Sequence, residues 1–220
     1  MMKLKSFLFL IGCVFTANVF AQQGFPFDNE IRAFKHQDSL SFPKPGGILF
    51  IGSSSIRLWD DLEQRFAGKP IIKRGVGGSQ LYQLVDYFTP YILFPYHPRK
   101  IFIYAGENDI ADGKSANFVA DEFVKLWTMI HQQLPGVEIY FMSIKPSPVR
   151  AKNYAVVAQA NTLIKAYLKN KPKSHYVDLV TAIYKPGTTT PDSSLFKADY
   201  LHLNPKGYDK WQAVLQPLVK

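Results

Sequence analysis

Cysteine is nearly absent from this sequence, because Cys13 is the only thiol among 220 residues. A single cysteine cannot form an intramolecular disulfide or supply the cysteine pairs of a structural zinc site. Four histidines also lack the spacing of a metal-binding motif, namely His36, His97, His131 and His175. The glycine-rich turn at residues 75–78 has no Walker lysine and does not match the dinucleotide-binding fingerprint. We therefore predict neither a metal nor a cofactor.

Long apolar segments are also missing after the first 21 residues, so we expect no stable membrane span. Residues 1–21 resemble an export signal, because Lys3 and Lys5 precede an apolar stretch too short to cross a bilayer and Ala21 ends a suitable cleavage site. A lipobox-like segment at Cys13 suggests a lipoprotein instead, but the apolar stretch continues beyond it. We favour an exported protein, periplasmic or secreted, from which cleavage removes Cys13.

Negative charge is scarce relative to positive charge, and the formal net charge is +9. The lysines and arginines are scattered, however, and form no long basic run. A scattered distribution is typical of a solvated surface, whereas a nucleic-acid interface gathers its basic residues into a patch or stripe. We predict no nucleic-acid partner, and the oligomeric state stays open.

Five apolar runs rich in β-branched and aromatic residues recur along the chain. They occupy residues 47–52, 70–75, 100–106, 137–144 and 174–180. Such runs are typical of strands covered on both faces, as in a parallel sheet. Helical patterns lie between and after them, at residues 79–93, 115–134, 154–169 and 206–219.

This alternation predicts an α/β fold, specifically a flavodoxin-like three-layer α/β/α sandwich around a five-stranded parallel sheet. The expected strand order is 2-1-3-4-5. Residues 22–45 are expected to form an N-terminal extension with a short helix near residues 29–34. Residues 46–220 are expected to form a single domain.

Polar motifs follow these runs, at the strand ends where open parallel sheets bind their ligands. Ser54 follows the first run, Gly78 ends the turn after the second, and Asn108 follows the third. Asp199 and His202 come after the fifth run, and their spacing of three can place them one helical turn apart. Serine becomes a nucleophile only beside a base. A serine, an imidazole and a carboxylate on one rim therefore predict nucleophilic hydrolysis.

Each of these residues also has a structural explanation when it is taken alone. Ser54 suits a helix N-cap, the glycines suit a tight turn, and Asn108 suits an Asx-turn. The α/β-hydrolase pattern fits less well, because Ile56 stands where its G-x-S-x-G motif has the final glycine. Only the combination of the motifs favours a catalytic site.

Four motifs in order, G-S-S-S-I, R-G-V-G-G-S, G-E-N-D and D-Y-L-H-L-N, resemble the blocks of the SGNH, or GDSL-type, hydrolase family. They extend over residues 52–204, and the segments G-S-S-S-I-R-L-W and I-K-P-S-P resemble an exported bacterial subgroup. The resemblance implies the SGNH hydrolase fold for residues 46–220. Ser53 stands where the family usually has aspartate, which puts substrate positioning in question more than the reaction type.

The resemblance also implies a role for each motif residue. Ser54 matches the nucleophile, His202 its base and Asp199 the acid that orients the base. The backbone N–H groups of Ser54 and Gly78, with the Asn108 side chain, match the oxyanion hole.

The implied activity is that of a serine esterase that hydrolyses carboxylic esters through an acyl-enzyme. We expect acetyl esters of carbohydrates as the first choice, so the partner is a small-molecule or glycan ester. Trp59, Tyr82 and Lys145 are possible substrate-binding side chains on the rim. The alternatives are a lysophospholipase or other long-chain acyl esterase, and a non-enzymatic carbohydrate-binding protein on the same fold.

Overall fold

The computed structural model describes residues 27–220 of the chain. The predicted signal peptide, its cleavage site after Ala21 and Cys13 lie outside the described residues, as does the start of the predicted extension. Within the described residues, no helix combines the length and the apolar character that a membrane crossing requires.

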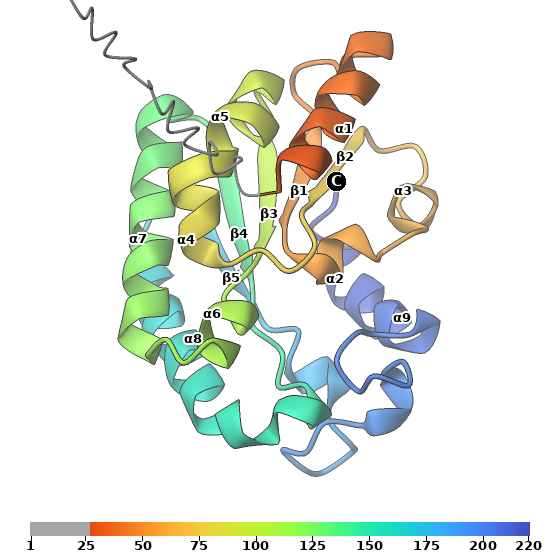
Figure 1. Cartoon of the computed structure of the whole chain (residues 1–220), viewed down its shortest axis with the longest axis vertical. Helices are drawn as coiled ribbons and strands as arrows, with labels where there is room; N and C mark the ends of the chain where they lie inside the picture. The colour runs from red at the N-terminus through yellow and green to blue at the C-terminus, as the bar shows by residue number, and fades with distance from the viewer. Residues whose placement is uncertain (1–26) are drawn as a thin grey trace, which may run out of the picture.

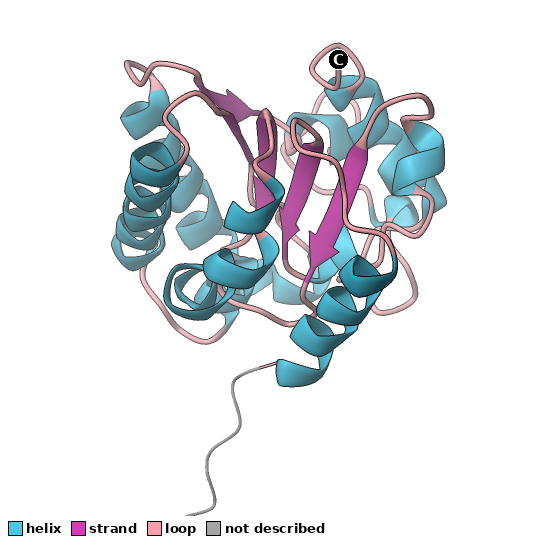
Figure 2. Cartoon of the chain, turned by 90° about the horizontal axis from the view of Figure 1, so that it is seen from above, coloured by secondary structure: helices cyan, strands magenta, loops and turns pink. Residues whose placement is uncertain are grey.

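Five parallel strands form a sheet in the order β2-β1-β3-β4-β5 (Figures 1 and 2). The strands are β1 (Ile48–Gly52), β2 (Ile71–Gly75), β3 (Lys100–Tyr104), β4 (Glu138–Met142) and β5 (Ser174–Val177). Each strand lies inside one predicted apolar run, and the structure confirms the parallel sheet and its order. Gly52 pairs in register with both Gly75 and Tyr104, which aligns the carboxyl ends of three strands at one edge.

Helices cover both faces of the sheet and complete the predicted three layers (Figures 1 and 2). One face carries α1 (Asp28–Leu40), α4 (Leu81–Gln83), α5 (Thr89–Ile92), α7 (Ala116–Gln133) and α8 (Tyr154–Leu168). The other face carries α2 (Ser54–Arg57), α3 (Leu62–Arg65) and α9 (Pro205–Leu215). A further short helix, α6 (Glu107–Ala111), follows β3 at the carboxyl edge.

The central strands are buried on both faces, which explains their unbroken apolar sequences. In β1, Leu49 belongs to one core cluster and Phe50 to the other, because successive side chains of a strand point to opposite faces. Phe50 stacks on Phe102 of β3, and Phe102 stacks on Tyr140 of β4, each with ring centroids 4.6 Å apart. This aromatic ladder ties three neighbouring strands together beneath α9 and its neighbours.

The predicted helix at residues 79–93 is helical without a gap from Leu81 to Ile92, but it is not a regular α-helix throughout. The segment divides into α4, a π-helical turn (Leu84–Phe88) and α5. Pro90 lies in the first turn of α5, and proline offers no N–H to a preceding carbonyl, so a regular α-helix cannot run through it. The expected helix near residues 29–34 is longer than predicted, because α1 continues to Leu40.

Candidate active site

Ser54 lies at the point where β1 passes into α2. Gly52 closes the strand at φ 147°, and the Ser53 N–H donates to the Tyr104 carbonyl at 3.0 Å. Ser54 is then the first residue of α2, so its backbone N–H has no acceptor within the helix. The junction therefore places the partly exposed Ser54 hydroxyl, and a Ser54 N–H that is not used within the helix, at the carboxyl edge of the sheet.

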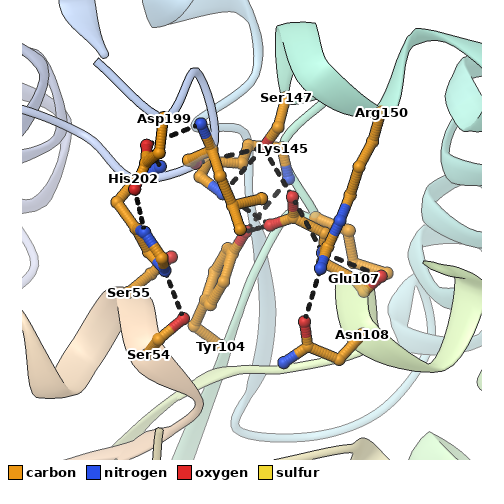
Figure 3. Close-up of polar contacts among 12 residues, drawn as sticks. Ser54, Ser55, Tyr104, Glu107, Asn108, Lys145, Ser147, Arg150, Asp199 and His202 are labelled. Atoms are coloured by element: carbon orange, nitrogen blue, oxygen red, sulfur yellow. Dashed lines mark hydrogen bonds and ion pairs between the residues drawn. The ribbon is translucent and has the colours of Figure 1, made fainter. Parts of the chain in front are cut away.

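The structure brings Ser54, His202 and Asp199 together (Figure 3). His202 Nε2 lies 3.0 Å from Ser54 Oγ, and His202 Nδ1 lies 2.7 Å from Asp199 Oδ2. A carboxylate only accepts hydrogen bonds, so in the neutral ring the proton sits on Nδ1. Nε2 then presents its lone pair to the serine hydroxyl, as a general base must.

Asp199 is held ionised by its own loop. Its Oδ1 accepts the backbone N–H groups of Leu201 and His202, both at 2.9 Å. Partial burial by itself raises the carboxyl pKa, but the backbone and ring hydrogen bonds from His202 and the Leu201 N–H lower the pKa of Asp199 to about 2. The carboxylate is consequently charged throughout the neutral range.

The sequence suggested that Asp199 and His202 lie one helical turn apart. In the structure, a tight loop brings them together instead. Tyr200 between them adopts a left-handed conformation at φ 52°. The Lys197 N–H donates to the His202 carbonyl at 2.7 Å and closes the loop. Directly afterwards, the Asn204 side chain accepts the Gly207 N–H at 3.1 Å and caps α9.

Gly78 and Asn108, the other two predicted oxyanion-hole residues, lie in neighbouring segments, because Asn108 contacts the residue after Gly78. Gly78 is exposed and has φ 78°, and a Cβ there would meet only the Phe27 ring at 4.0 Å, so its backbone conformation is what requires glycine. Asn108 Nδ2 donates to the carbonyl of Ser79, the next residue, at 3.0 Å. Asp109 accepts the Leu81 N–H at 2.8 Å and also ties this loop to α6.

A buried polar cluster lies behind Asn108, and the sequence analysis missed it. The Glu107 carboxylate accepts from Tyr104 at 2.8 Å and from Lys145 and Ser147 at 2.5 Å each. Burial by itself raises the pKa of Glu107, but the Lys145 ammonium and the Ser147 hydroxyl bring it below its usual value. Burial also lowers the pKa of Lys145, against the opposing effect of Glu107. The K-P-S-P segment after β4 was the signal of this cluster in the sequence. A lysine that directly follows a buried strand can itself be buried, and a buried ammonium needs a charged or polar partner.

Two of the three predicted substrate-binding side chains, Lys145 and Trp59, are buried and do not lie on the rim. Lys145 is 1% exposed and paired with Glu107, so it cannot reach a substrate on the rim. Trp59 is 0% exposed, and its ring packs 4.8 Å from the ring of Tyr208 on α9. Its large apolar surface is used in the core. Tyr82 is half-buried, with its ring 6.5 Å from that of Phe118.

Tyr200 is the exposed aromatic residue that lies next to the candidate acid in sequence, at 52% exposure. Its carbonyl accepts the Val149 N–H at 3.2 Å, which brings it beside a second exposed apolar residue. The left-handed conformation of Tyr200, two residues before His202, could not be read from the sequence. Among residues 27–220, no group of three His, Cys, Asp or Glu side chains is arranged to hold a metal ion.

The sequence and the fold are both similar to those of known proteins. Residues 50–210 match the model of the GDSL-like lipase/acylhydrolase family. Human platelet-activating factor acetylhydrolase IB subunit alpha1 is 23% identical over 169 residues, which cover 73% of this chain and 70% of that protein.

Many solved structures share the fold. A GDSL-like lipase from Bacteroides thetaiotaomicron superposes with a TM-score of 0.70 at 20% identity, covering 88% of this chain and 98% of the other. A family 3 carbohydrate esterase from Clostridium thermocellum superposes with a TM-score of 0.62 at 19% identity, covering 80% of this chain and 100% of the other. The family match spans most of the chain and includes the serine, the asparagine and the aspartate–histidine pair. The chain therefore belongs to the GDSL-like lipase/acylhydrolase family and is a carboxylic ester hydrolase.

Proposed function

We propose that the protein is a serine esterase that works through an acyl-enzyme, with Ser54 as the nucleophile. The observation that carries this proposal is the continuous chain of contacts from Ser54 Oγ to His202 at 3.0 Å and from His202 to Asp199 at 2.7 Å. His202 takes the hydroxyl proton while Ser54 Oγ bonds to the ester carbonyl carbon. Asp199 keeps the ring oriented and stabilises its positive charge.

The carbonyl oxygen gains negative charge in this step, and three donors face it in the proposed site. They are the backbone N–H groups of Ser54 and Gly78 and the side-chain N–H of Asn108. His202 then gives its proton to the alcohol oxygen as the ester C–O bond breaks. Water, activated by the same base, attacks the acyl-enzyme, and the proton returns to Ser54 as the acid leaves.

Replacing the nucleophile tests this mechanism. Ser54→Ala is expected to lower kcat for p-nitrophenyl acetate at least about 10³-fold, since the covalent route is lost. A fluorophosphonate probe should label the wild-type protein at Ser54 and leave the variant unlabelled. Ser41→Ala, an exposed serine at the end of α1, is the matched control and should keep wild-type turnover and labelling. Undiminished turnover by the Ser54 variant contradicts the assignment.

For the substrate, we propose short acyl groups, acetyl above all, on a carbohydrate. Two similarities support this choice: the human relative is by name an acetylhydrolase, and the Clostridium neighbour is by name a carbohydrate esterase. The exposed ring of Tyr200 beside Asp199 also offers a face on which a sugar can stack.

Long-chain acyl esters, including lysophospholipids, are the second candidate, supported by the name of the Bacteroides lipase. Turnover of p-nitrophenyl acetate, butyrate and octanoate separates the two acyl classes. Acetate release from acetylated xylan, compared with fatty-acid release from lysophosphatidylcholine, separates the two alcohol classes. Preference for octanoate and the lysolipid would replace the carbohydrate proposal with the second one.

A further inference from the structure

We propose that Arg150 is a positioning residue that fixes the amide of Asn108 and thereby sets the oxyanion hole. The inference rests on the proposed role of Asn108 as an oxyanion donor. Arg150 lies in the short 3-10 helix Pro148–Asn153, after β4, far in sequence from the G-E-N-D motif. Its Nη2 donates to Asn108 Oδ1 at 3.1 Å.

The orientation of the Asn108 amide follows from what each neighbour can do. A guanidinium only donates, so the carbonyl oxygen of the amide must face Arg150. The Ser79 carbonyl only accepts, so it takes one N–H of Asn108 Nδ2, at 3.0 Å. A carboxamide is planar, and these two contacts leave one N–H in a fixed direction. In Figure 3, the amide nitrogen of Asn108 lies on the side of Ser54 and the oxygen on the side of Arg150.

Arg150 is itself held by the buried cluster. Its Nη1 donates to the Glu107 backbone carbonyl at 3.4 Å and lies 3.4 Å from Glu107 Oε1. The same carboxylate is fixed by Lys145 and Ser147. A half-buried guanidinium with this many contacts has little freedom, so it can hold Asn108 in one position throughout a turnover.

The segment that carries Arg150 also contacts the loop of the base. Ser147 Oγ, besides its bond to Glu107, lies 3.2 Å from the Leu201 carbonyl oxygen. The Arg150 N–H donates to the Ser147 carbonyl at 2.9 Å. One short segment therefore touches both the oxyanion donor and the residue that precedes His202, which fixes the two halves of the site relative to each other.

Arg150→Met tests the proposal, with Lys152→Met as the matched control, because Lys152 is an exposed cation of the same 3-10 helix. We expect kcat for p-nitrophenyl acetate to fall about 10-fold or more in Arg150→Met with KM nearly unchanged, since the lost alignment acts on the transition state. Lys152→Met should match the wild type. Loss of kcat in the control as well would indicate a general charge effect and overturn the proposal.

A double-mutant cycle separates positioning from a structural role. If Arg150 acts through Asn108, Asn108→Ala combined with Arg150→Met should be no slower than Asn108→Ala alone. Multiplicative losses would overturn the proposal. Arg150→Lys, which keeps a donor in place, should recover part of the lost kcat.

A readout that does not depend on catalysis is the Asn108 side-chain amide in ¹⁵N–¹H spectra, identified by its absence in Asn108→Ala. We expect its two proton shifts to be distinct in the wild type and in Lys152→Met, and to move toward solvent-averaged values in Arg150→Met. An unchanged signal in Arg150→Met would overturn the positioning role. This measurement remains decisive even if Ser54→Ala keeps full turnover, in which case the proposed function alone is refuted.

Discussion

Tyr200 holds a left-handed backbone conformation at φ 52°, which bulky side chains rarely adopt. The conformation allows Asp199 to accept two backbone N–H groups and still reach the His202 ring. An L-residue in this region costs roughly 1–2 kcal/mol relative to a relaxed conformation. A large aromatic ring at such a position, exposed beside the site, is consistent with a role in substrate binding.

Tyr200→Asn should therefore separate stability from binding. Asparagine tolerates the left-handed region, so we expect the free energy of unfolding to rise by about 0.5–1 kcal/mol in urea denaturation. KM for an acetylated xylo-oligosaccharide should rise several-fold, while KM for p-nitrophenyl acetate should change little. Tyr200→Phe, which keeps the ring, should retain the wild-type KM. An unchanged KM for the oligosaccharide in Tyr200→Asn would exclude the stacking role.

The pKa of Asp199 predicts how its contribution to stability varies with pH. Its folded value of about 2 lies below the ordinary value near 3.9, so its contribution is complete above about pH 5 and is lost as the pH falls toward 2. Its side chain is 45% exposed, which limits the effect to on the order of 1 kcal/mol. The difference in unfolding free energy between the wild type and Asp199→Asn should shrink as the pH falls from 5 to 3. A constant difference down to pH 3 would contradict this.

At the scale of single residues, the sequence identified the candidate catalytic residues but not the side chains that hold the site in place. Ser54, Asp199 and His202 could be found because each stands in a short motif after an apolar run. Arg150 and Glu107 could not be paired, because the predicted strand order brings the ends of β3 and β4 together but does not show which side chains of the segments that follow them meet. Trp59 was misjudged for a related reason: an aromatic residue near a motif looks the same in sequence whether its ring faces solvent or the core.

The junction between β1 and α2 depends on close backbone approach. A Cβ on Gly52 would lie 1.9 Å from the Tyr104 carbonyl oxygen, and its φ of 147° is unfavourable for any other residue. Neither the strand nor the turn that presents Ser54 can shift without breaking the ladder to β3.

Gly52→Ala is consequently expected to destabilise the protein by at least about 3 kcal/mol, or to prevent folding. Gly136→Ala is the matched control, because a Cβ at Gly136 would meet no atom within 4 Å, and its effect should stay within about 0.5 kcal/mol. Urea denaturation followed by circular dichroism measures both. A wild-type midpoint for Gly52→Ala would contradict the close approach described for this junction.

The elements themselves were largely predictable, and the exceptions have physical causes. Apolar runs identified all five strands, and the runs are least interrupted in β1 and β3, which lie inside the sheet and are covered on both faces. The helices α7 and α8 followed their apolar periodicity, and Ser115 caps α7 by accepting the Phe118 N–H at 3.1 Å. Periodicity alone could not show the π-helical turn before Pro90, since the apolar stripe continues through it.

For the whole molecule, the site depends on contacts between distant parts of the chain. Ser54 and His202 are 148 residues apart in sequence, and α2 and α9 meet on one face of the sheet, where Tyr208 donates to the Ser55 carbonyl at 3.0 Å. The geometry of the site is thus a property of the complete fold.

Esterase activity and far-UV circular dichroism should therefore be lost at the same urea concentration, within the error of the two midpoints. Lys100, whose ammonium donates to the Leu218 carbonyl, links the start of β3 to the end of the chain and offers a way to shift both curves together. Lys100→Met is expected to move the two midpoints by the same amount. Activity lost well before the dichroism signal would show that the site opens locally.

The separation of the serine from its base also has a consequence during synthesis. Translation delivers Ser54 early and His202 late, so a nascent chain on the ribosome carries a hydroxyl with no partner to deprotonate it. In the proposed mechanism, hydrolysis therefore begins only once α9 has docked, and a chain terminated before His202 would have no esterase activity.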